Sequence, residues 1–275
     1  MKDQSMLKNK IIPVLSFLLA AMVTIVSLVG LYSPGFYSAE TVNWQLQTRG
    51  QDIIDLFIVI PCLLVSALFA YNNNRIAMAV WGGTVFYLAY SFTIYCFNIH
   101  FNRLFILYCL CLGFSFYSTL YFLVTAYKEQ FFFRPGKNSG TSYISIYFIL
   151  IASLFYILWL AEIIPANLRN TIPNSLEETG LVTNGVHVLD LAIVLPAIVI
   201  TGISLLKRKL IGFILTPLLL VFFVLMDITI AFLQYLMQKK GLAEQLSVMY
   251  VMLLLALTSS LLLVLFYRKS KTGSP

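Results

Sequence analysis

The chain has 275 residues, of which 60% are hydrophobic and only 11% are charged. Charged residues make up about a quarter of an ordinary soluble domain, so this composition excludes that class. The formal net charge of +7 does not indicate nucleic-acid binding, because Lys and Arg cluster between long apolar runs, where membrane proteins carry them for topological reasons. The expected partner is therefore the lipid bilayer and not a nucleic acid.

The apolar runs predict eight membrane spans, because each has about 18 or more residues and can cross a hydrocarbon core of about 30 Å. In the first half, spans are expected at about 11–31, 52–71, 76–97 and 104–127. In the second half, they are expected at about 143–164, 188–205, 211–236 and 246–267. The first run is expected to be a true span, because it is too long for the core of a cleaved signal peptide.

The distribution of positive charge predicts the orientation of the chain in the membrane. With eight spans and both termini cytoplasmic, 13 of the 18 Lys and Arg residues lie on the inner side. Such an excess on cytoplasmic segments is typical of multi-span proteins. The predicted location is the cell membrane, with the N- and C-termini in the cytoplasm.

One stretch of the sequence occurs twice. Residues 48–61 and 183–196 are identical at seven of fourteen positions at a constant offset of 135. The matching pairs are Thr48/Thr183, Gly50/Gly185, Asp55/Asp190, Leu56/Leu191, Ile58/Ile193, Val59/Val194 and Pro61/Pro196. We interpret this as an internal duplication of 1–137 and 138–275. Four spans per half insert the same way up, so the predicted fold is an all-α integral membrane protein made of two parallel four-helix repeats.

Two short motifs resemble a group of uncharacterised multi-span bacterial membrane proteins. The first is Gly50-Gln51-Asp52 ahead of a span that contains a proline, and the second is Phe101-Asn102-Arg103-Leu104-Phe105 at the start of the fourth span. The similarity extends over most of the chain. It implies a similar fold and carries no activity or functional residues.

Five acidic residues lie in or next to the predicted spans, each in the outer part of its span. They are Asp52, Asp55, Glu162, Asp190 and Asp227. A charge within a membrane span is costly and often functional, so these residues are candidate ligand- or proton-binding groups. His187 joins them because it is equivalent to Asp52 at the 135-residue offset, three residues before the shared Asp.

The duplicated span also carries matched hydroxyl and proline residues. Ser66 and Thr201 lie eleven residues after the shared Asp and return to nearly the same helix face, which makes them further candidate binding groups. Pro61 and Pro196 are expected to kink both helices near the middle of the membrane. Matched interruptions in two repeats indicate a binding site at the repeat interface.

Structural roles explain some of these residues equally well. An Asp in the first turn of a helix is stabilised by the helix dipole, which would account for Asp52. Asp227 could be a hydrogen-bonded residue inside the bundle, and the two histidines could be interface or capping residues. A metal site made of His100, His187, Asp52 and Asp190 is only weakly indicated, and no motif names a cofactor.

Three classes of function remain open. The leading hypothesis is a transporter or a binder of a small molecule or cation, in which Asp55 and Asp190 face a shared, water-filled outer cavity between the repeats. The first alternative is a structural or sensory membrane subunit whose acids only cap and pair. The second is a membrane enzyme with an outward-facing acid, histidine or metal site. The sequence indicates neither the ligand nor the oligomeric state.

Overall fold

The computed structural model describes residues 2–130, 141–242 and 245–271. These residues form helices and connecting turns, with no strand among them. The boundary expected at 137/138 between the two halves lies outside the described residues. The elements are α1 (Lys2–Tyr32), α2 (Val42–Ile54), η1 (Asp55–Val59), α3 (Ile60–Tyr71), α4 (Arg75–Asn98), α5 (Phe105–Glu129), α6 (Ser142–Arg169), α7 (Asn174–Thr179), α8 (Gly185–Leu189), η2 (Asp190–Val194), α9 (Leu195–Leu206), α10 (Leu210–Lys239) and α11 (Ser247–Lys271).

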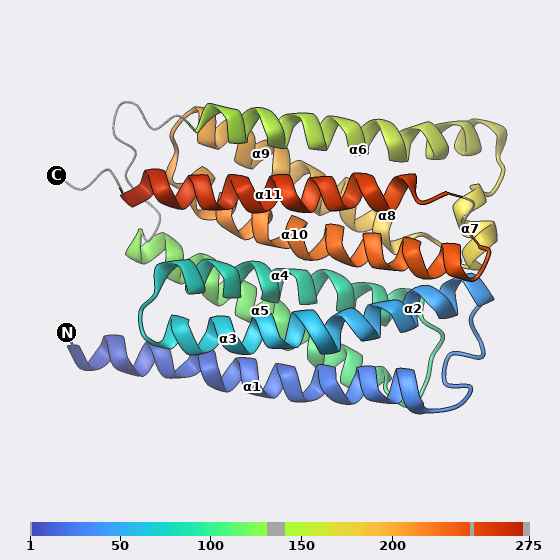
Figure 1. Ribbon diagram of the computed structural model, residues 1–275, viewed down its shortest axis with the longest axis horizontal. Helices are drawn as coiled ribbons and strands as arrows, with labels where there is room; N and C mark the ends of the chain where they lie inside the picture. Colours follow the sequence, from blue (N-terminus) through green and yellow to red (C-terminus); the bar gives the residue numbers. More distant parts are fainter. Residues whose placement is uncertain (1, 131–140, 243–244, 272–275) are drawn as a thin grey trace.

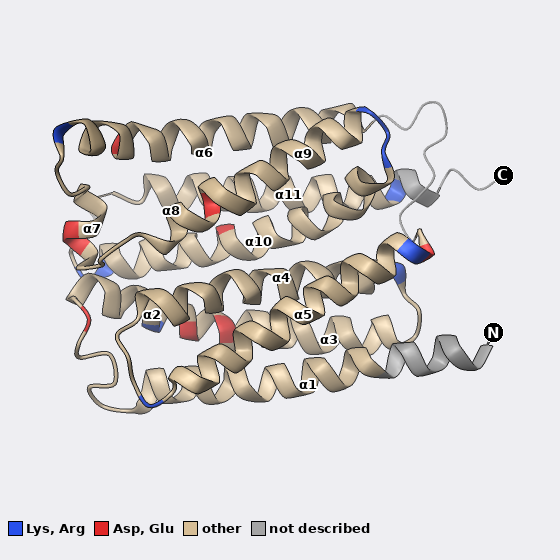
Figure 2. Cartoon of the chain, turned by 180° about the vertical axis from the view of Figure 1, so that it is seen from behind, with Lys and Arg blue, Asp and Glu red and all other residues tan. Residues whose placement is uncertain are grey.

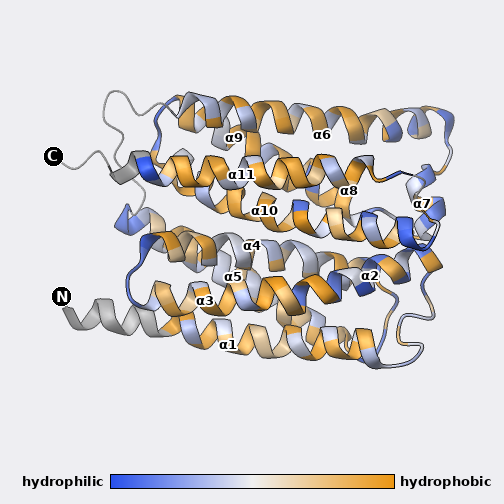
Figure 3. Ribbon diagram, viewed as in Figure 1, coloured by the Kyte–Doolittle hydropathy of each residue, from blue (hydrophilic) through white to orange (hydrophobic). Residues whose placement is uncertain are grey.

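The prediction of eight apolar spans is confirmed for the described residues. Eight helical segments are long and apolar enough to cross a membrane, and this fits a multi-pass membrane protein. Their middle parts are hydrophobic and the two ends of the bundle are hydrophilic (Figure 3). Many large apolar side chains on the outer helices are exposed, as expected for a surface that faces lipid.

The helices form two groups that meet along α4 and α10 (Figure 1). One group contains α1, α2, α3, α4 and α5, and the other contains α6, α8, α9, α10 and α11. In their most apolar stretches, 67% of the α4 residues and 72% of the α10 residues are buried, against only 17% in α11. Helices α4 and α10 are therefore central, and α11 lies at the periphery. The short helix α7 lies at the end of the bundle opposite the start of α1 (Figure 1).

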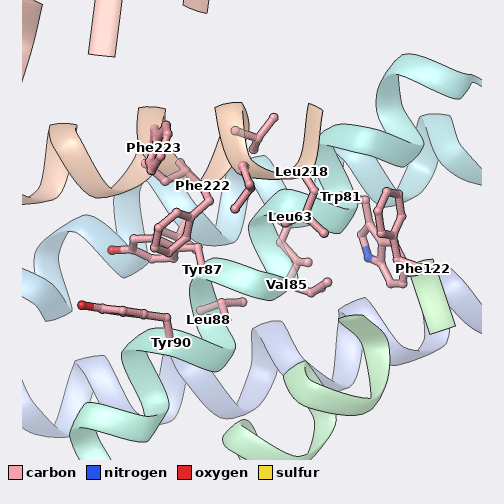
Figure 4. Packing of buried hydrophobic residues seen from close by; sticks show 14 of the residues in the cluster. Leu63, Trp81, Val85, Tyr87, Leu88, Tyr90, Phe122, Leu218, Phe222 and Phe223 are labelled. Atoms are coloured by element: carbon pink, nitrogen blue, oxygen red, sulfur yellow. The ribbon is translucent and has the colours of Figure 1, made fainter. Parts of the chain in front are cut away.

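Glycines allow the two groups to approach closely. A Cβ atom at Gly83 of α4 would clash with the Val221 side chain and the Leu218 carbonyl of α10. A Cβ atom at Gly50 of α2 would clash with Leu233 of α10. Small residues at such crossings let membrane helices pack by van der Waals contact. Figure 4 shows the aromatic and aliphatic side chains that fill the space around this contact, including Leu218 and Phe222.

The second span begins ten residues earlier than the sequence predicted. Helix α2 starts at Val42, and its N-cap is Thr41, whose hydroxyl accepts a hydrogen bond from the Trp44 backbone N–H (3.3 Å). Asp52 therefore lies about three turns into the helix, where the helix dipole no longer stabilises a charge. The interpretation of Asp52 as a first-turn capping residue is wrong.

The two similar stretches, 48–61 and 183–196, have matching backbone irregularities. Five-residue π-helical turns run over Asp55–Val59 and Asp190–Val194, and in each the N–H after the valine donates to the carbonyl of the aspartate. Pro61 and Pro196 follow two residues later, in the first turn of α3 and of α9. The wider turn suits a following proline, which lacks an N–H and whose ring clashes with a regular helical carbonyl.

Candidate functional site

A cavity of about 460 Å³ lies between the two helix groups, in the half of the bundle that carries α7. Its lining comes from α2 and α4 of the first half and from α6, α7, α8, η2, α9, α10 and α11 of the second. The volume is in the range of small-molecule sites in proteins. The polar and charged lining residues are Asn43, Gln47, Thr48, Gln51, Ser91, Glu162, Ser175, Glu178, Thr179, Asn184, His187, Asp190, Asp227, Thr229 and Gln234.

Asp190 lines this cavity from the second half of the chain. Its Oδ1 accepts a hydrogen bond from the Tyr90 hydroxyl of α4 (3.0 Å), and its Oδ2 accepts one from Trp159 Nε1 of α6 (2.9 Å). Both donors are neutral, so they fix the carboxylate without cancelling its charge. Figure 4 shows the Tyr90 and Tyr87 hydroxyls extending to the same side of α4.

Asp227 lines the cavity from α10, and its carboxylate differs from that of Asp190 in its lack of hydrogen-bond donors among the residues that the structure describes. Only 6% of the residue is exposed, and within the described residues its carboxylate makes no hydrogen bond or ion pair. Phe223, Ile230 and Gln234 follow the 4-3-4 spacing of one helix face with Asp227, and all four line the cavity. A buried polar group without a partner is costly, so a ligand that supplies a donor or a positive charge would be stabilised at Asp227.

Glu162 and His187 form a third polar cluster in the lining. Glu162 Oε1 accepts a hydrogen bond from the Ser175 backbone N–H in the first turn of α7 (2.9 Å), and its Oε2 lies 4.0 Å from His187 Nε2. The His187 ring packs against Trp159 with a centroid separation of 4.5 Å. This cluster connects α6, the region of α7, and α8 at the hydrophilic end of the bundle.

The lining has a strong charge bias. Among the described residues it contains four carboxylate side chains and one histidine, but no Lys or Arg. Figure 2 shows Lys and Arg toward the two ends of the bundle, whereas acidic residues also occur along the helices between them. In the low-dielectric interior of a membrane protein, such a set of groups favours positive charge.

Asp52 and Asp55 lie outside the cavity lining. Asp52 has no exposed surface and accepts hydrogen bonds from the hydroxyls of Tyr37 (2.9 Å) and Tyr95 (2.8 Å). Burial, and then the Asp52 charge, raises the pKa of Tyr37 well above its ordinary value, so Tyr37 stays a neutral donor. Gly30 of α1 leaves room for this pair, because a Cβ atom there would clash with the Asp52 carboxylate and the Tyr37 hydroxyl.

Asp55 is separated from the cavity by Gln51. The Gln51 amide, which does line the cavity, donates to Asp55 Oδ1 (2.9 Å) and to the Tyr87 hydroxyl (2.8 Å). Tyr87 is in turn hydrogen-bonded to the Thr229 hydroxyl of α10 (2.7 Å). Asp55 Oδ2 is buried and has no hydrogen-bond partner among the described residues. Asp190 therefore lies in the cavity lining, whereas Asp55 lies behind the Gln51 side chain and does not reach the cavity.

The matched hydroxyl residues do not reach the cavity. The Ser66 hydroxyl donates to the Leu63 carbonyl (3.1 Å) and the Thr201 hydroxyl to the Ala197 carbonyl (2.7 Å), each within its own helix. Neither residue belongs to the lining. Both hydroxyls therefore satisfy backbone carbonyl groups close to the prolines.

The two histidines are in different clusters. His100 donates its backbone N–H to Glu40 Oε1 (2.8 Å), and its ring Nδ1 lies 3.0 Å from Glu40 Oε2. His187 is with Glu162, as described above. Within the described residues, no three His, Cys, Asp or Glu side chains come together in a way that could hold a metal ion. The proposed set of His100, His187, Asp52 and Asp190 is therefore not assembled.

Sequence reasoning missed four residues that shape these clusters: Glu40, Gln51, Tyr90 and Trp159. Glu40 lies in the loop between α1 and α2, and it is only 7% exposed. The Gly-Gln-Asp motif does contain Gln51, and its position four residues before Asp55 would have indicated a contact on one helix face. The contacts of Tyr90 and Trp159 with Asp190 join residues 100 and 31 positions apart. No local pattern in the sequence marks such contacts.

Comparison of the chain with protein-family models, with curated proteins and with solved structures finds no match. A functional assignment for this chain therefore depends on the geometry and chemistry of its own residues. The cavity between the two helix groups is the feature that carries such an assignment.

Proposed function

We propose that this protein is a transporter or a binder of a small molecule or cation, and that the cavity between the two helix groups is its binding site. The observation that carries the proposal is the lining itself. It joins residues of both halves and, in the part of the chain that the structure describes, contains carboxylates without any Lys or Arg. Ionisable residues inside membrane proteins commonly mark ligand or ion pathways. Pockets of this size, mainly apolar and with a few polar groups, are typical of small-molecule sites.

The proposed duplication supports transport in particular. Beyond the two π-helical turns, the equivalent helices α3 and α9 end at Tyr71 and Leu206, and α4 and α10 begin at Arg75 and Leu210, again 135 residues apart. In transporters built from repeats, the substrate site lies between the repeats, next to irregular helix segments. Rocking of one half against the other would then expose the cavity to each side in turn.

The orientation proposed for the chain makes the cavity outward-facing. If the protein lies in the cell membrane with both termini in the cytoplasm, α7 lies at the outer surface. The excess of Lys and Arg on the opposite side supports this orientation.

A structural or sensory subunit is the alternative, and Asp52 is the observation that favours it. Its carboxylate is enclosed and bonded by two tyrosines, which is the environment of a residue that stabilises a fold. Asp52 and Asp55 do not line the cavity, so we propose that they stabilise the helices around the site and do not contact the ligand.

Blocking the cavity tests the proposal. Ile94 of α4 lines the cavity, and Ile94→Trp should fill part of it, whereas Ile146→Trp adds the same volume at a position on α6 that is 54% exposed and outside the lining. Purified protein in phosphatidylcholine nanodiscs would be titrated with benzyltrimethylammonium, benzoate, phenylalanine and benzyl alcohol. We expect at least one probe to bind the wild type and Ile146→Trp but not Ile94→Trp. Failure of all four probes to bind the wild type would overturn the proposal.

A further inference from the structure

The negative charge of the cavity lining is not fully paired with positive charge from the lining's own described residues. Asp190 is held by two neutral donors, and Glu162 faces His187 at 4.0 Å. Asp227 has neither a donor nor a counter-charge among the described residues, although it is more than nine-tenths buried and lines the cavity. One buried carboxylate therefore lacks the partner that would offset its desolvation.

Aromatic rings surround the part of the cavity near these acids. Trp159, Tyr90, Phe155, Tyr147, Phe222 and Phe223 all belong to the lining. Tyr90 packs against Phe222 at 5.4 Å between ring centroids, and Trp159 packs against Phe155 at 6.0 Å. The faces of aromatic rings attract cations, most strongly where water is excluded. Rings and carboxylates together form a cage that suits an ammonium group.

The same lining argues against an inorganic cation. No three metal-ligating side chains come together in the described part of the chain. A bare metal ion prefers a shell of six or more oxygen atoms, or a tetrahedral set of nitrogen and sulfur atoms. A volume of about 460 Å³ is also far larger than such an ion needs, and its walls are mainly hydrocarbon. The site suits a ligand that has an apolar body.

We infer that the cavity binds an organic monocation, an amine or quaternary ammonium compound with an apolar or aromatic group, whose charge pairs with Asp227. The inference rests on the proposed function, because it names the ligand class of the same cavity. Asp227 supplies the counter-charge, Asp190 adds a second negative charge in an orientation fixed by Tyr90 and Trp159, and the rings contact the apolar body. Glu162 and Glu178, near α7, provide further negative charge toward the hydrophilic end of the bundle.

The test compares three probes of similar size that differ in charge: benzyltrimethylammonium, benzyl alcohol and benzoate. Binding to the full-length protein in phosphatidylcholine nanodiscs would be measured by calorimetry, so that no anionic lipid supplies a competing charge. We expect the wild type to prefer the cation over the other two by about tenfold or more. Asp227→Asn should weaken cation binding by about tenfold or more and leave benzyl alcohol binding within about twofold. Asp190→Asn should have a smaller effect of the same sign.

Two further variants keep the test decisive. Glu177→Gln removes an exposed acid of α7 that does not line the cavity, and it should leave cation binding unchanged. Gln234→Lys places a positive charge two turns from Asp227 on the same face of α10, so it should abolish cation binding and allow benzoate to bind, even if Asp227→Asn does not fold. Equal binding of cation and alcohol, or an unchanged affinity in Asp227→Asn, would overturn the inference. If benzoate or benzyl alcohol binds the wild type at least as tightly as the cation, and Ile94→Trp abolishes that binding, the cation assignment alone would be overturned. If no probe binds the wild type, the proposed function would be overturned as well.

Discussion

Asp55 and Asp190 each begin a five-residue π-helical turn at equivalent positions of the chain, but only Asp190 lines the cavity. The local backbone is the same because each turn precedes a proline that a regular helix would not accommodate. The surroundings differ because Gln51 lies between Asp55 and the cavity, while the Asp190 carboxylate accepts hydrogen bonds from Tyr90 and Trp159 and lines the cavity directly. Equivalent residues thus have different access to the same space.

The close contact between α1 and Asp52 predicts a strong effect of a single methyl group. Gly30→Ala should displace Asp52 or Tyr37, because the added Cβ atom clashes with both side chains. We expect a loss of about 2–4 kcal/mol in the free energy of unfolding, from broken buried hydrogen bonds and overpacking. Denaturant titration of the purified protein in detergent would measure it.

Gly113→Ala is the matched control, since, apart from the neighbouring backbone of its own helix, no atom of the described residues lies within 4 Å of the position of its added Cβ atom. This change should be neutral or stabilise the protein by up to about 1 kcal/mol, because alanine loses less entropy than glycine in a helix. Equal stability of the two variants would show that Gly30 does not make room for Asp52.

Removal of one tyrosine hydroxyl tests the bonds to Asp52 directly. Tyr95→Phe should lower the free energy of unfolding by about 1.5–3 kcal/mol, the range for a hydrogen bond to a charged group. Tyr117→Phe on α5, where the ring is 69% exposed, should change it by less than about 0.5 kcal/mol. If the two variants unfold at the same temperature, the Asp52 cluster does not stabilise the fold.

Alkaline pH should weaken the same cluster through Tyr37. Its pKa is raised in the folded protein, so the stability it contributes is fully present below the unfolded value of about 10 and is lost as the pH rises above that value. Tyr37→Phe should therefore lose less stability than the wild type between about pH 9 and pH 11. Melting temperatures of both proteins measured across this range would show whether the wild type loses more stability. A steeper loss in Tyr37→Phe would contradict the prediction.

The spans were predictable because an apolar run of about 20 residues has few structures open to it other than a membrane helix. The start of α2 was not predictable from the same signal. Residues 42–51 are largely polar, and they are helical because Thr41 caps them and because Trp44, Thr48 and Gly50 are buried within the protein. The acids of the duplicated stretch were found from their spacing, but their partners Tyr95, Tyr90 and Trp159 come from other helices. Contacts of that kind depend on how the helices pack and leave no periodic trace in one sequence.

The hydrogen-bonded chain through Gln51 predicts non-additive mutations. Gln51→Leu leaves Asp55 without any hydrogen-bond donor, so it should lower the free energy of unfolding by about 1.5–3 kcal/mol. In the double variant Gln51→Leu/Asp55→Leu both polar groups are removed, and the loss should be smaller than the sum of the two single losses. Gln47→Leu, which breaks only the contact with Asn43 (2.6 Å), is the matched control. A double-mutant cycle with no coupling would show that Gln51 does not support Asp55.

The proposed orientation predicts which surface positions are open to the outside of the cell. In a variant whose four native cysteines are replaced, Ile172→Cys should react with a membrane-impermeant thiol reagent in intact cells, because residue 172 lies between α6 and α7 and is 62% exposed. Arg208→Cys, between α9 and α10, should react only after the membrane has been opened, because these two positions lie at opposite ends of the bundle. The excess of Lys and Arg at the end that carries residue 208 is the reason for placing that end in the cytoplasm. Labelling of Arg208→Cys in intact cells, with Ile172→Cys protected, would reverse the orientation and turn the acidic cavity toward the cytoplasm.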